Sequence, residues 1–272
     1  MVNKPFHEFM MNTGAVSSKL IETPFGLYCL TGYPVLFHYI DFQTYKIQNP
    51  DIAFLPGVFS AAQKLDHKII TIWQDVWQNK QELVQARILA MIGKRERVHA
   101  RQTHIARLDK AATTAFLDQN HLQGSTGAYY KFGLLFNNEL VAAATFSKAR
   151  TMYDGPVYYR SYELERFASK KGITVTGGLG KLINHFTQQL NAGHMMTYAD
   201  ADWGSGKGYR KLGFSFTGHS VPQQFIIDEA HNKRTYFDPA AHSAEEIKEK
   251  GLLLIANTGS LKYVLTPDLH QQ

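Results

Sequence analysis

Two periods of hydrophobic residues recur along this chain of 272 residues, and together they predict a mixture of strands and helices. The segment 162–169, YELERFAS, alternates apolar and charged residues as a half-buried strand does. The segment 181–190 instead places Leu182, Ile183, Phe186 and Leu190 on one side of a helix. Strands and helices in this proportion predict an α/β (α+β) fold, a mixed sheet flanked by helices.

The remaining elements follow from the same signals. Apolar or alternating runs predict strands within 25–42 (two, broken by glycine and proline), 68–73, 131–136, 140–146, 157–169, 195–202 and 220–228. Helical spacing predicts helices within 60–67, 79–93, 111–124 and 207–213. Two prolines in 50–57 predict a loop or an edge strand, Asn137-Asn138 predicts a hairpin turn, and 252–265 predicts a terminal hairpin around Asn257–Gly259.

These elements predict three regions along the chain. Residues 1–92 form a small α/β module, residues 93–110 a basic linker, and residues 111–272 a second domain. The formal net charge is +6 and the sequence pI about 9.2, a mild basic bias that is compatible with a nucleic-acid partner. The single cysteine, Cys29, excludes an internal disulfide and a cysteine-based zinc site. We expect a cytoplasmic protein with no membrane segment and no metal centre.

The stretch that carries most chemistry is 173–190. Gly177, Gly178 and Gly180 stand directly ahead of a helix, and Lys181 adds a positive charge in its first turn. The unpaired N–H groups at a helix N-terminus attract anions, most often phosphates. A tight strand-to-helix turn explains the same glycines equally well.

The order of elements in this part of the chain resembles the acyl-CoA-binding half of the GNAT superfamily of acyltransferases. It runs strand, glycine loop, helix, strand and then Tyr209-x-x-x-Gly213-Phe214. In that family the loop reads [RQ]-x-x-G-x-[GA] and binds the CoA pyrophosphate. Gly178 and Gly180 match the two glycines, whereas Val175 replaces the Arg or Gln. The resemblance implies acetyl-CoA or another acyl donor, bound at Gly177, Gly178, Gly180 and Lys181.

A narrower resemblance covers most of residues 111–265. The segments NHLQGSTGAYYKFGLLFNNELVAAATFSKAR, YELERFASKKGITVTGGLGKL, TYADADW and GYRKLGFSFTG are similar to the GNAT-like carboxy-terminal domain of phage homing-endonuclease-type proteins, a domain related to the Mom proteins that modify adenine in DNA. This resemblance implies a base amine as acceptor, with Asp200 orienting or deprotonating it and Tyr209 acting as general acid. It also implicates His121, Glu163 and Arg166.

Each of these residues also has a structural interpretation. Asp200 could cap a turn, and Tyr209 could be a buried aromatic residue of the core. His121, which lies near Ser125, could be a structural histidine whose hydrogen bonds are made within the protein. Glu163 and Glu165 should share one face of their strand while Arg166 takes the other, and an ion pair with a neighbouring strand is the alternative role. Trp203 could stack on a base or seal its loop.

Six Lys and Arg residues against two acids in 93–110 predict contacts with phosphates, through Lys94, Arg95, Arg97, Arg101 and Arg107. The segment 67–93 resembles the end of a Vsr-like nuclease domain, which gathers carboxylates around a divalent metal. Asp41 and Asp75 could supply two of them, but Gln74 stands where the resemblance places Glu. We therefore expect a degenerate module without nuclease activity.

The sequence as a whole predicts a nucleic-acid-associated GNAT-like group transferase that modifies a DNA base amine with an activated acyl donor. Two alternatives stay open. The first is a non-catalytic DNA-binding protein derived from a homing endonuclease, and the second is an acetyl-CoA-dependent N-acetyltransferase of a small amine.

Overall fold

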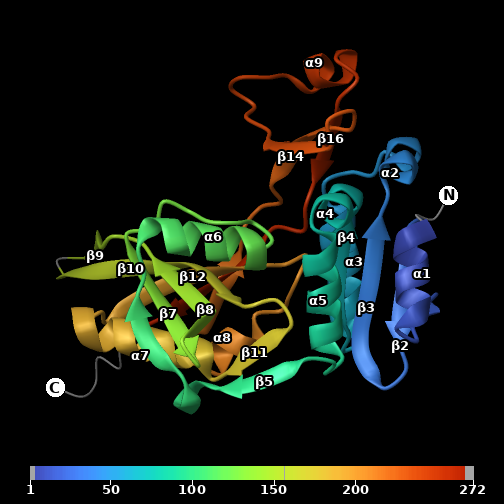
Figure 1. Ribbon diagram of the computed structural model, residues 1–272. Coiled ribbons are helices and arrows are strands. Elements are labelled where there is room, and N and C mark those ends of the chain that lie inside the picture. The colour runs from blue at the N-terminus through green and yellow to red at the C-terminus, as the bar shows by residue number, and fades with distance from the viewer. Residues whose placement is uncertain (1–3, 156, 267–272) are drawn as a thin grey trace. The chain divides into compact units, whose positions relative to one another are not determined.

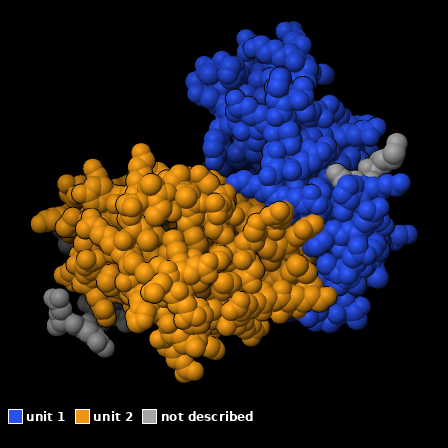
Figure 2. Space-filling model, viewed as in Figure 1, with its two compact units in different colours: residues 1–81, 199–205, 219–261 blue, residues 82–198, 206–218, 262–272 orange. Residues whose placement is uncertain are grey.

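The computed structural model describes residues 4–155 and 157–266, and its chain divides into two compact units (Figure 2). Unit 1 comprises residues 1–81, 199–205 and 219–261, and unit 2 comprises residues 82–198, 206–218 and 262–272. Both units combine strands with helices, which confirms the predicted mixed α/β class (Figure 1). The chain therefore passes between the units several times, whereas the sequence predicted consecutive regions.

Unit 1 contains a four-stranded sheet in the order β1-β2-β3-β4. Its elements are α1 (Lys4–Asn12), β1 (Val16–Ser17), β2 (Gly26–Leu30), β3 (Tyr33–Ile40), α2 (Phe42–Gln48), α3 (Phe54–Lys64), β4 (Lys68–Trp73) and α4 (Gln74–Asn79). β3 and β4 are parallel, so the chain crosses between them through α2 and α3. α3 begins inside the segment predicted to be a loop or edge strand, because Pro56 falls in its first turn, where a missing N–H costs nothing.

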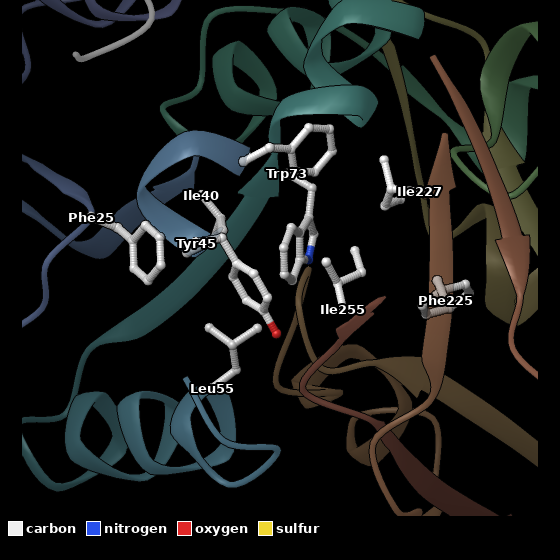
Figure 3. Close-up of a cluster of buried hydrophobic side chains, with 9 residues drawn as sticks. Phe25, Ile40, Tyr45, Leu55, Trp73, Phe225, Ile227 and Ile255 are labelled. Carbon is white, nitrogen blue, oxygen red and sulfur yellow. The ribbon is translucent and has the colours of Figure 1, made fainter. Parts of the chain in front are cut away.

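A second sheet completes unit 1, in the order β15-β14-β16. Its elements are β14 (Gln224–Asp228), β15 (Lys233–Tyr236), α9 (Ala244–Glu249) and β16 (Leu253–Ala256). Side chains of both sheets meet in one buried cluster around Trp73 and Tyr45, where Phe225, Ile227 and Ile255 pack against residues from the first half of the chain (Figure 3). This cluster explains why residues 219–261 belong to unit 1.

Unit 2 is built on an eight-stranded sheet with the order β13-β17-β12-β10-β8-β7-β6, and β9 pairs with β10. These strands are β6 (His104–Arg107), β7 (Tyr130–Phe136), β8 (Glu139–Phe146), β9 (Arg150–Asp154), β10 (Val157–Ser169), β12 (His194–Asp200), β13 (Ser215–His219) and β17 (Ser260–Leu265). The pairs among β6, β7, β8, β9 and β10 are antiparallel, as predicted, and β12 is parallel to β10. Asn137 and Asn138 both have positive φ, which confirms the predicted turn between β7 and β8.

Two helices pack on opposite faces of this sheet. Phe186 of α7 (Gly178–Leu190) stacks on Phe146 with ring centroids 4.0 Å apart. Phe116 and Leu117 of α6 (Lys110–Asn120) pack against Ala143. Residues 143 and 146 of β8 point to opposite faces because side chains alternate along a strand. The predicted apolar face of α7 is confirmed for Leu182, Ile183 and Phe186, which are buried, whereas Leu190 at the end of the helix is only half-buried.

The stretch expected to be a linker forms ordered elements of unit 2. After α5 (Gln81–Met91), residues 93–110 contain β5 (Glu96–His99), the 3-10 turn η1 (Ala100–Gln102) and β6. β5 pairs in parallel with β11 (Ile173–Thr176), the strand that leads into the glycine loop. The basic residues of this stretch are thus fixed beside α7.

The predicted terminal hairpin is wrong, because β16 pairs with β14 and β17 joins the large sheet. Gly259 suggested a hairpin turn, yet its role is to let the backbone of another segment pack closely against it. A Cβ at this position would lie 2.7 Å from the carbonyl oxygen of Ser220. Among the described residues, no helix combines the length and the apolar character needed to cross a membrane.

Candidate functional site

The candidate site of unit 2 lies where two parallel strands separate. β10 and β12 form four consecutive pairs, the last of which joins Leu164 to Thr197. Beyond this pair β10 continues alongside β8, and a β-bulge between Leu164 and Arg166 shifts its register at the same level. Ligands of α/β sheets commonly bind outside the carboxyl ends of parallel strands. Here two such ends diverge.

The glycine loop enters α7 without a capping side chain. Gly177 precedes the helix with a φ of 78°, a left-handed conformation that glycine adopts readily. The amide of Lys181 bonds to the carbonyl of Gly177, which closes the first turn of the helix. The amides of Gly178, Leu179 and Gly180 come before that bond and lie at the positive end of the helix dipole. This is the geometry expected of an anion site.

Packing accounts for the glycines as well. A Cβ on Gly178 would lie 2.9 Å from Cγ1 of Val175, and a Cβ on Gly180 would lie 2.9 Å from Cδ2 of Leu212. The loop therefore needs both glycines for its own close packing. Val175, which stands at the Arg or Gln position of the family pattern, is buried and adds no charge.

Lys181 is directed to the protein itself. Its ammonium donates to the carbonyl oxygens of Ala100, at 2.9 Å, and Thr103, and so ties η1 to the first turn of α7. A Cβ on Gly177 would lie 3.6 Å from Cβ of Ala100, so η1 runs directly beside the loop. Arg101, which is exposed on η1, is consequently a cation near the loop whose side chain faces solvent.

Tyr209 lies at the level where β10 and β12 part. It belongs to α8 (Lys207–Arg210), which begins after Gly206, and a Cβ on that glycine would lie 2.2 Å from the ring of Tyr263. The side chain of Thr197 hydrogen-bonds to Tyr209 and donates to the carbonyl of Leu164 at 2.9 Å. Burial raises the pKa of Tyr209, although that hydrogen bond lowers it. The phenol therefore keeps its proton at neutral pH, as a general acid must.

Asp200 ends β12 and belongs to unit 1, whereas Tyr209 belongs to unit 2, so their joint action stays a prediction. The carboxylate of Asp200 accepts from the amide of Asp202 at 3.0 Å. Asp202 is buried, where it accepts from the indole of Trp73 and the amide of Thr258, and burial raises its pKa.

Trp203 is only 8% exposed. This burial favours the interpretation that Trp203 seals its loop, and base contact by Trp203 stays a prediction.

Glu163 carries a perturbed carboxyl group on β10. Burial raises its pKa and the nearby charge of Glu165 raises it further, while Arg150 and Arg166 lower it. An oxygen of Glu163 lies 3.8 Å from the guanidinium of Arg150 on the neighbouring strand β9. An ion pair with a neighbouring strand was the alternative role suggested by the sequence. A carboxylate whose pKa is moved toward neutrality is a better general base than an ordinary one.

Arg166 lies directly after the β-bulge of β10. Its guanidinium donates to the carbonyl of Glu165 at 2.8 Å and to that of Gly124 at 3.3 Å. Its charge also lowers the pKa of Glu163, which places the two side chains within electrostatic range of each other. The carboxylate of Glu165 accepts from the hydroxyl of Thr126 at 2.6 Å.

His121 ends α6 and is engaged locally. Its Nδ1 accepts from the amide of Gln123 at 3.2 Å, so the lone pair of this ring nitrogen is already engaged. Ser125 donates its amide to Asp118 at 2.8 Å. The segment 121–125 thus forms a structured turn after the helix, and a catalytic role for His121 stays a prediction.

The five basic residues predicted to contact phosphates are all exposed. Lys94 and Arg95 precede β5, Arg97 lies on β5, Arg101 on η1 and Arg107 on β6. Their exposure keeps them available to an anion, and nucleic-acid binding stays a prediction.

The carboxylates suggested for a nuclease-type metal have structural partners. Asp41 caps α2 by accepting from the amide of Thr44 at 2.8 Å. Asp75 forms a two-bond ion pair with Arg234, with both distances 2.8 Å. The side chain of Gln74 accepts from the amide of Phe42. Within residues 4–155 and 157–266, no cluster of three or more His, Cys, Asp or Glu could hold a metal ion.

Sequence reasoning missed Thr197, which links Tyr209 to the point where the strands part. The available signal is a polar residue at an inward position of an otherwise apolar strand, in MMTYAD. It also missed the exposed tyrosines of β9 and β10, whose signal is the aromatic and basic run VYYR.

No protein-family model matches the sequence, and no curated protein matches it. Similar solved structures include an acetyltransferase of Bacillus subtilis in complex with CoA, the ribosomal-protein-S18-alanine N-acetyltransferase of Escherichia coli and a GNAT family acetyltransferase of Elizabethkingia anophelis with acetyl-CoA bound. Their identities to this chain are 12%, 13% and 11%, with TM-scores of 0.38, 0.38 and 0.35. The matches cover 60%, 62% and 61% of this chain and 98%, 97% and 98% of those proteins. The likeness is distant, and it assigns none of their activities to this chain.

Proposed function

We propose that unit 2 is a GNAT-type acyltransferase that moves an acyl group from an acyl-CoA donor to an amine of a nucleic-acid base. The observation that carries this proposal is the convergence of three features on one part of unit 2. β10 and β12 diverge after Leu164 and Thr197, Tyr209 bonds to Thr197 at that level, and α7 begins with uncapped amides.

An acyl-CoA donor would supply an acyl group activated as a thioester. The amides of Gly178, Leu179 and Gly180 fit its diphosphate, because they have no capping side chain and close packing excludes a Cβ at both glycines. Positive charge would come from the exposed Arg101 on η1, since Val175 supplies none.

The residues of the chain cover both proton transfers of such a reaction. Attack by the amine on the acyl carbon forms a C–N bond and breaks the C–S bond, so the amine loses one proton and the sulfur gains one. Glu163 accepts the first proton, and its raised pKa suits that role. Tyr209 holds the second proton, because burial raises its pKa.

A nucleic-acid acceptor is supported by the charge of unit 2. This unit carries 19 Lys and Arg residues against 9 Asp and Glu residues, a formal net charge of +10. A domain of that charge attracts polyanions. The sequence resemblance to the Mom-related domain supports a base amine in particular.

The first experiment tests donor binding through a thermal shift with acetyl-CoA. Saturation at 100 times Kd stabilises the bound protein by about 2.7 kcal/mol, which is easily detected. Mass spectrometry of nucleosides then compares cells that express the parent chain with cells that express Tyr209→Phe.

We expect an acylated nucleoside in the parent digest alone. Absence of a thermal shift would reject the acyltransferase. Donor binding with an unmodified digest and an acylated small amine would instead support the small-amine N-acetyltransferase.

A further inference from the structure

We propose that the β9–β10 hairpin of unit 2 binds an unpaired segment of nucleic acid, whose bases stack on Tyr153 and Tyr158. The inference rests on the proposed function only for its nucleic-acid partner. The acyl donor and its chemistry play no part in it.

The two tyrosines form a cross-strand pair. In the antiparallel ladder of β9 and β10, Tyr158 lies directly opposite Tyr153, and Arg160 lies opposite Thr151. Directly opposite residues share a face of the sheet, as do residues two apart on one strand. Tyr153 is 75% exposed and Tyr158 is 70% exposed. One face of the hairpin therefore presents two phenol rings to solvent with a guanidinium next in line.

The opposite face anchors the hairpin to the sheet. The ring of Tyr159 lies 4.8 Å from the ring of His194 on β12. Nδ1 of that histidine is 2.8 Å from the hydroxyl oxygen of Ser161. The exposed tyrosines are consequently carried by a strand that continues into the core of unit 2, so little order has to be gained when a ligand binds.

Cations lie close to the hairpin along the chain. The ammonium of Lys148 lies 4.9 Å from the ring centroid of Tyr129, which is exposed, and the guanidinium of Arg160 lies 5.9 Å from that of Tyr162, which is buried. Arg150, at the start of β9, is also exposed. Rings interleaved with positive charges match the two repeating parts of a single strand, the base and the phosphate.

The exposed ring faces favour an unpaired strand over a duplex. A duplex hides the faces of its bases in the stack, so it could use the cations of the hairpin but not the tyrosine rings. An acidic peptide has the same restriction, because it offers charge and no planar bases. Stacking of bases on aromatic side chains also tolerates any sequence.

The test measures fluorescence anisotropy of a labelled oligothymidylate of about 12 nucleotides and of a duplex of the same length, with the full chain and no acyl donor. We expect the single strand to bind more tightly than the duplex. The double variant Tyr153→Ala/Tyr158→Ala should bind the single strand about tenfold more weakly or worse, and its duplex binding should change little.

Matched variants separate stacking from charge and from folding. Tyr236→Ala removes a tyrosine that is 68% exposed in unit 1 and should leave affinity unchanged. The double variant Tyr153→Phe/Tyr158→Phe keeps both rings and should retain parental affinity. Arg160→Gln should reduce the slope of log K against the logarithm of the salt concentration by about 1, because one phosphate contact is lost. Unchanged melting temperatures would confirm that each variant is folded.

The proposal is overturned if the double alanine variant binds the single strand as well as the parent does. It is also overturned if the parent binds duplex as tightly as single strand, or if polyglutamate binds equally tightly and loses affinity in the same variant. The acetyl-CoA thermal shift keeps the two proposals distinguishable. A parent chain with no shift but tyrosine-dependent binding would fail as an acyltransferase and still bind nucleic acid at the hairpin.

Discussion

The two units of this protein use charged residues in opposite ways. Unit 1 carries 10 Lys and Arg residues against 14 Asp and Glu residues, a net charge of −4, while unit 2 carries a net charge of +10. Several carboxylates of unit 1 hold its fold together: Asp41 caps a helix, Asp75 pairs with Arg234, and Asp202 accepts from Trp73. In unit 2 the cations of 94–107 and of the β9–β10 hairpin are exposed instead.

This difference changes the meaning of the overall charge of +6, which by itself indicates only a mild basic bias. The bias is the small difference between one strongly basic unit and one acidic unit. A polyanion is therefore expected to bind unit 2 alone, and Asp41, Asp75 and Asp202 of unit 1 are expected to affect stability rather than function. Substitutions in each unit should separate these two roles.

Removal of a carboxylate from unit 1 should cost the most. Asp75→Ala removes both bonds to the guanidinium of Arg234, whose side chain is 21% exposed, and we expect a cost of about 3 kcal/mol, the lower end for a broken buried pair. All three tryptophans of the chain lie in unit 1, so tryptophan fluorescence during urea unfolding reports this unit.

The exposed pair of Lys170 and Glu139 in unit 2 is the matched control. Lys170→Ala should change the free energy of unfolding by less than about 1 kcal/mol. Equal effects of the two variants would remove the contrast between the units.

Removal of a hydroxyl from unit 2 should affect activity rather than stability. Tyr209→Phe keeps the ring contacts with Phe214 and Tyr263. It removes the phenolic hydroxyl that is hydrogen-bonded to Thr197, and with it the proton that the acid would donate. We expect kcat to fall about a hundredfold, the lower end for a lost general acid, with unchanged donor affinity and melting temperature. Tyr198→Phe, an exposed tyrosine of β12, is the control. Parental activity in Tyr209→Phe would exclude Tyr209 as the acid.

Local patterns in the sequence predicted the elements of unit 2 well. Alternation located β10, helical spacing located α7 with its buried Leu182 and Phe186, and the Asn137-Asn138 pair located a hairpin turn. Each of these features is decided by neighbours within a few residues. For the same reason the glycine loop and Tyr209 could be singled out from the sequence alone.

Pairings between distant segments could not be predicted. Residues 253–256 look like one arm of a hairpin with β17, yet they pair with β14 because Ile255 packs into the cluster around Trp73. The bulge between Leu164 and Arg166 likewise depends on the pairing of β10 with β8. The two-unit division, with a chain that returns to unit 1 twice, follows from such long-range contacts and from no local signal.

Acid should weaken unit 1 through one buried histidine. His38 is fully buried beside Thr23, and burial lowers its pKa from 6.5 to about 3. Above pH 6.5 the ring is neutral in both states and costs nothing. Below pH 6.5 this histidine binds a proton in the unfolded chain but stays neutral in the folded chain. The free energy of unfolding therefore falls by about 1.4 kcal/mol per pH unit, or about 2 kcal/mol by pH 5.

The control is the same titration with His38→Gln, followed by tryptophan fluorescence. The variant can be less stable than the parent at neutral pH. Between pH 6.5 and pH 5, however, its free energy of unfolding should fall less steeply with pH, because no buried histidine is left at this position. Parallel slopes in parent and variant would mean that His38 is protonated in the folded state.

The smallest effect is expected at Glu163, and its sign matters more than its size. Burial and the charge of Glu165 raise the pKa of Glu163 above its ordinary value of 4.5, so the folded state disfavours the ionised form. The parent should therefore lose stability relative to Glu163→Gln as pH rises past that value, which the far-UV circular dichroism transition would report. Below pH 4.5 the difference between the two proteins should shrink. If Glu163 is the base, the same variant gains stability at neutral pH while acyl transfer falls, because a site residue is retained at a cost to the fold. A variant that is more stable and equally active would exclude Glu163 as the base.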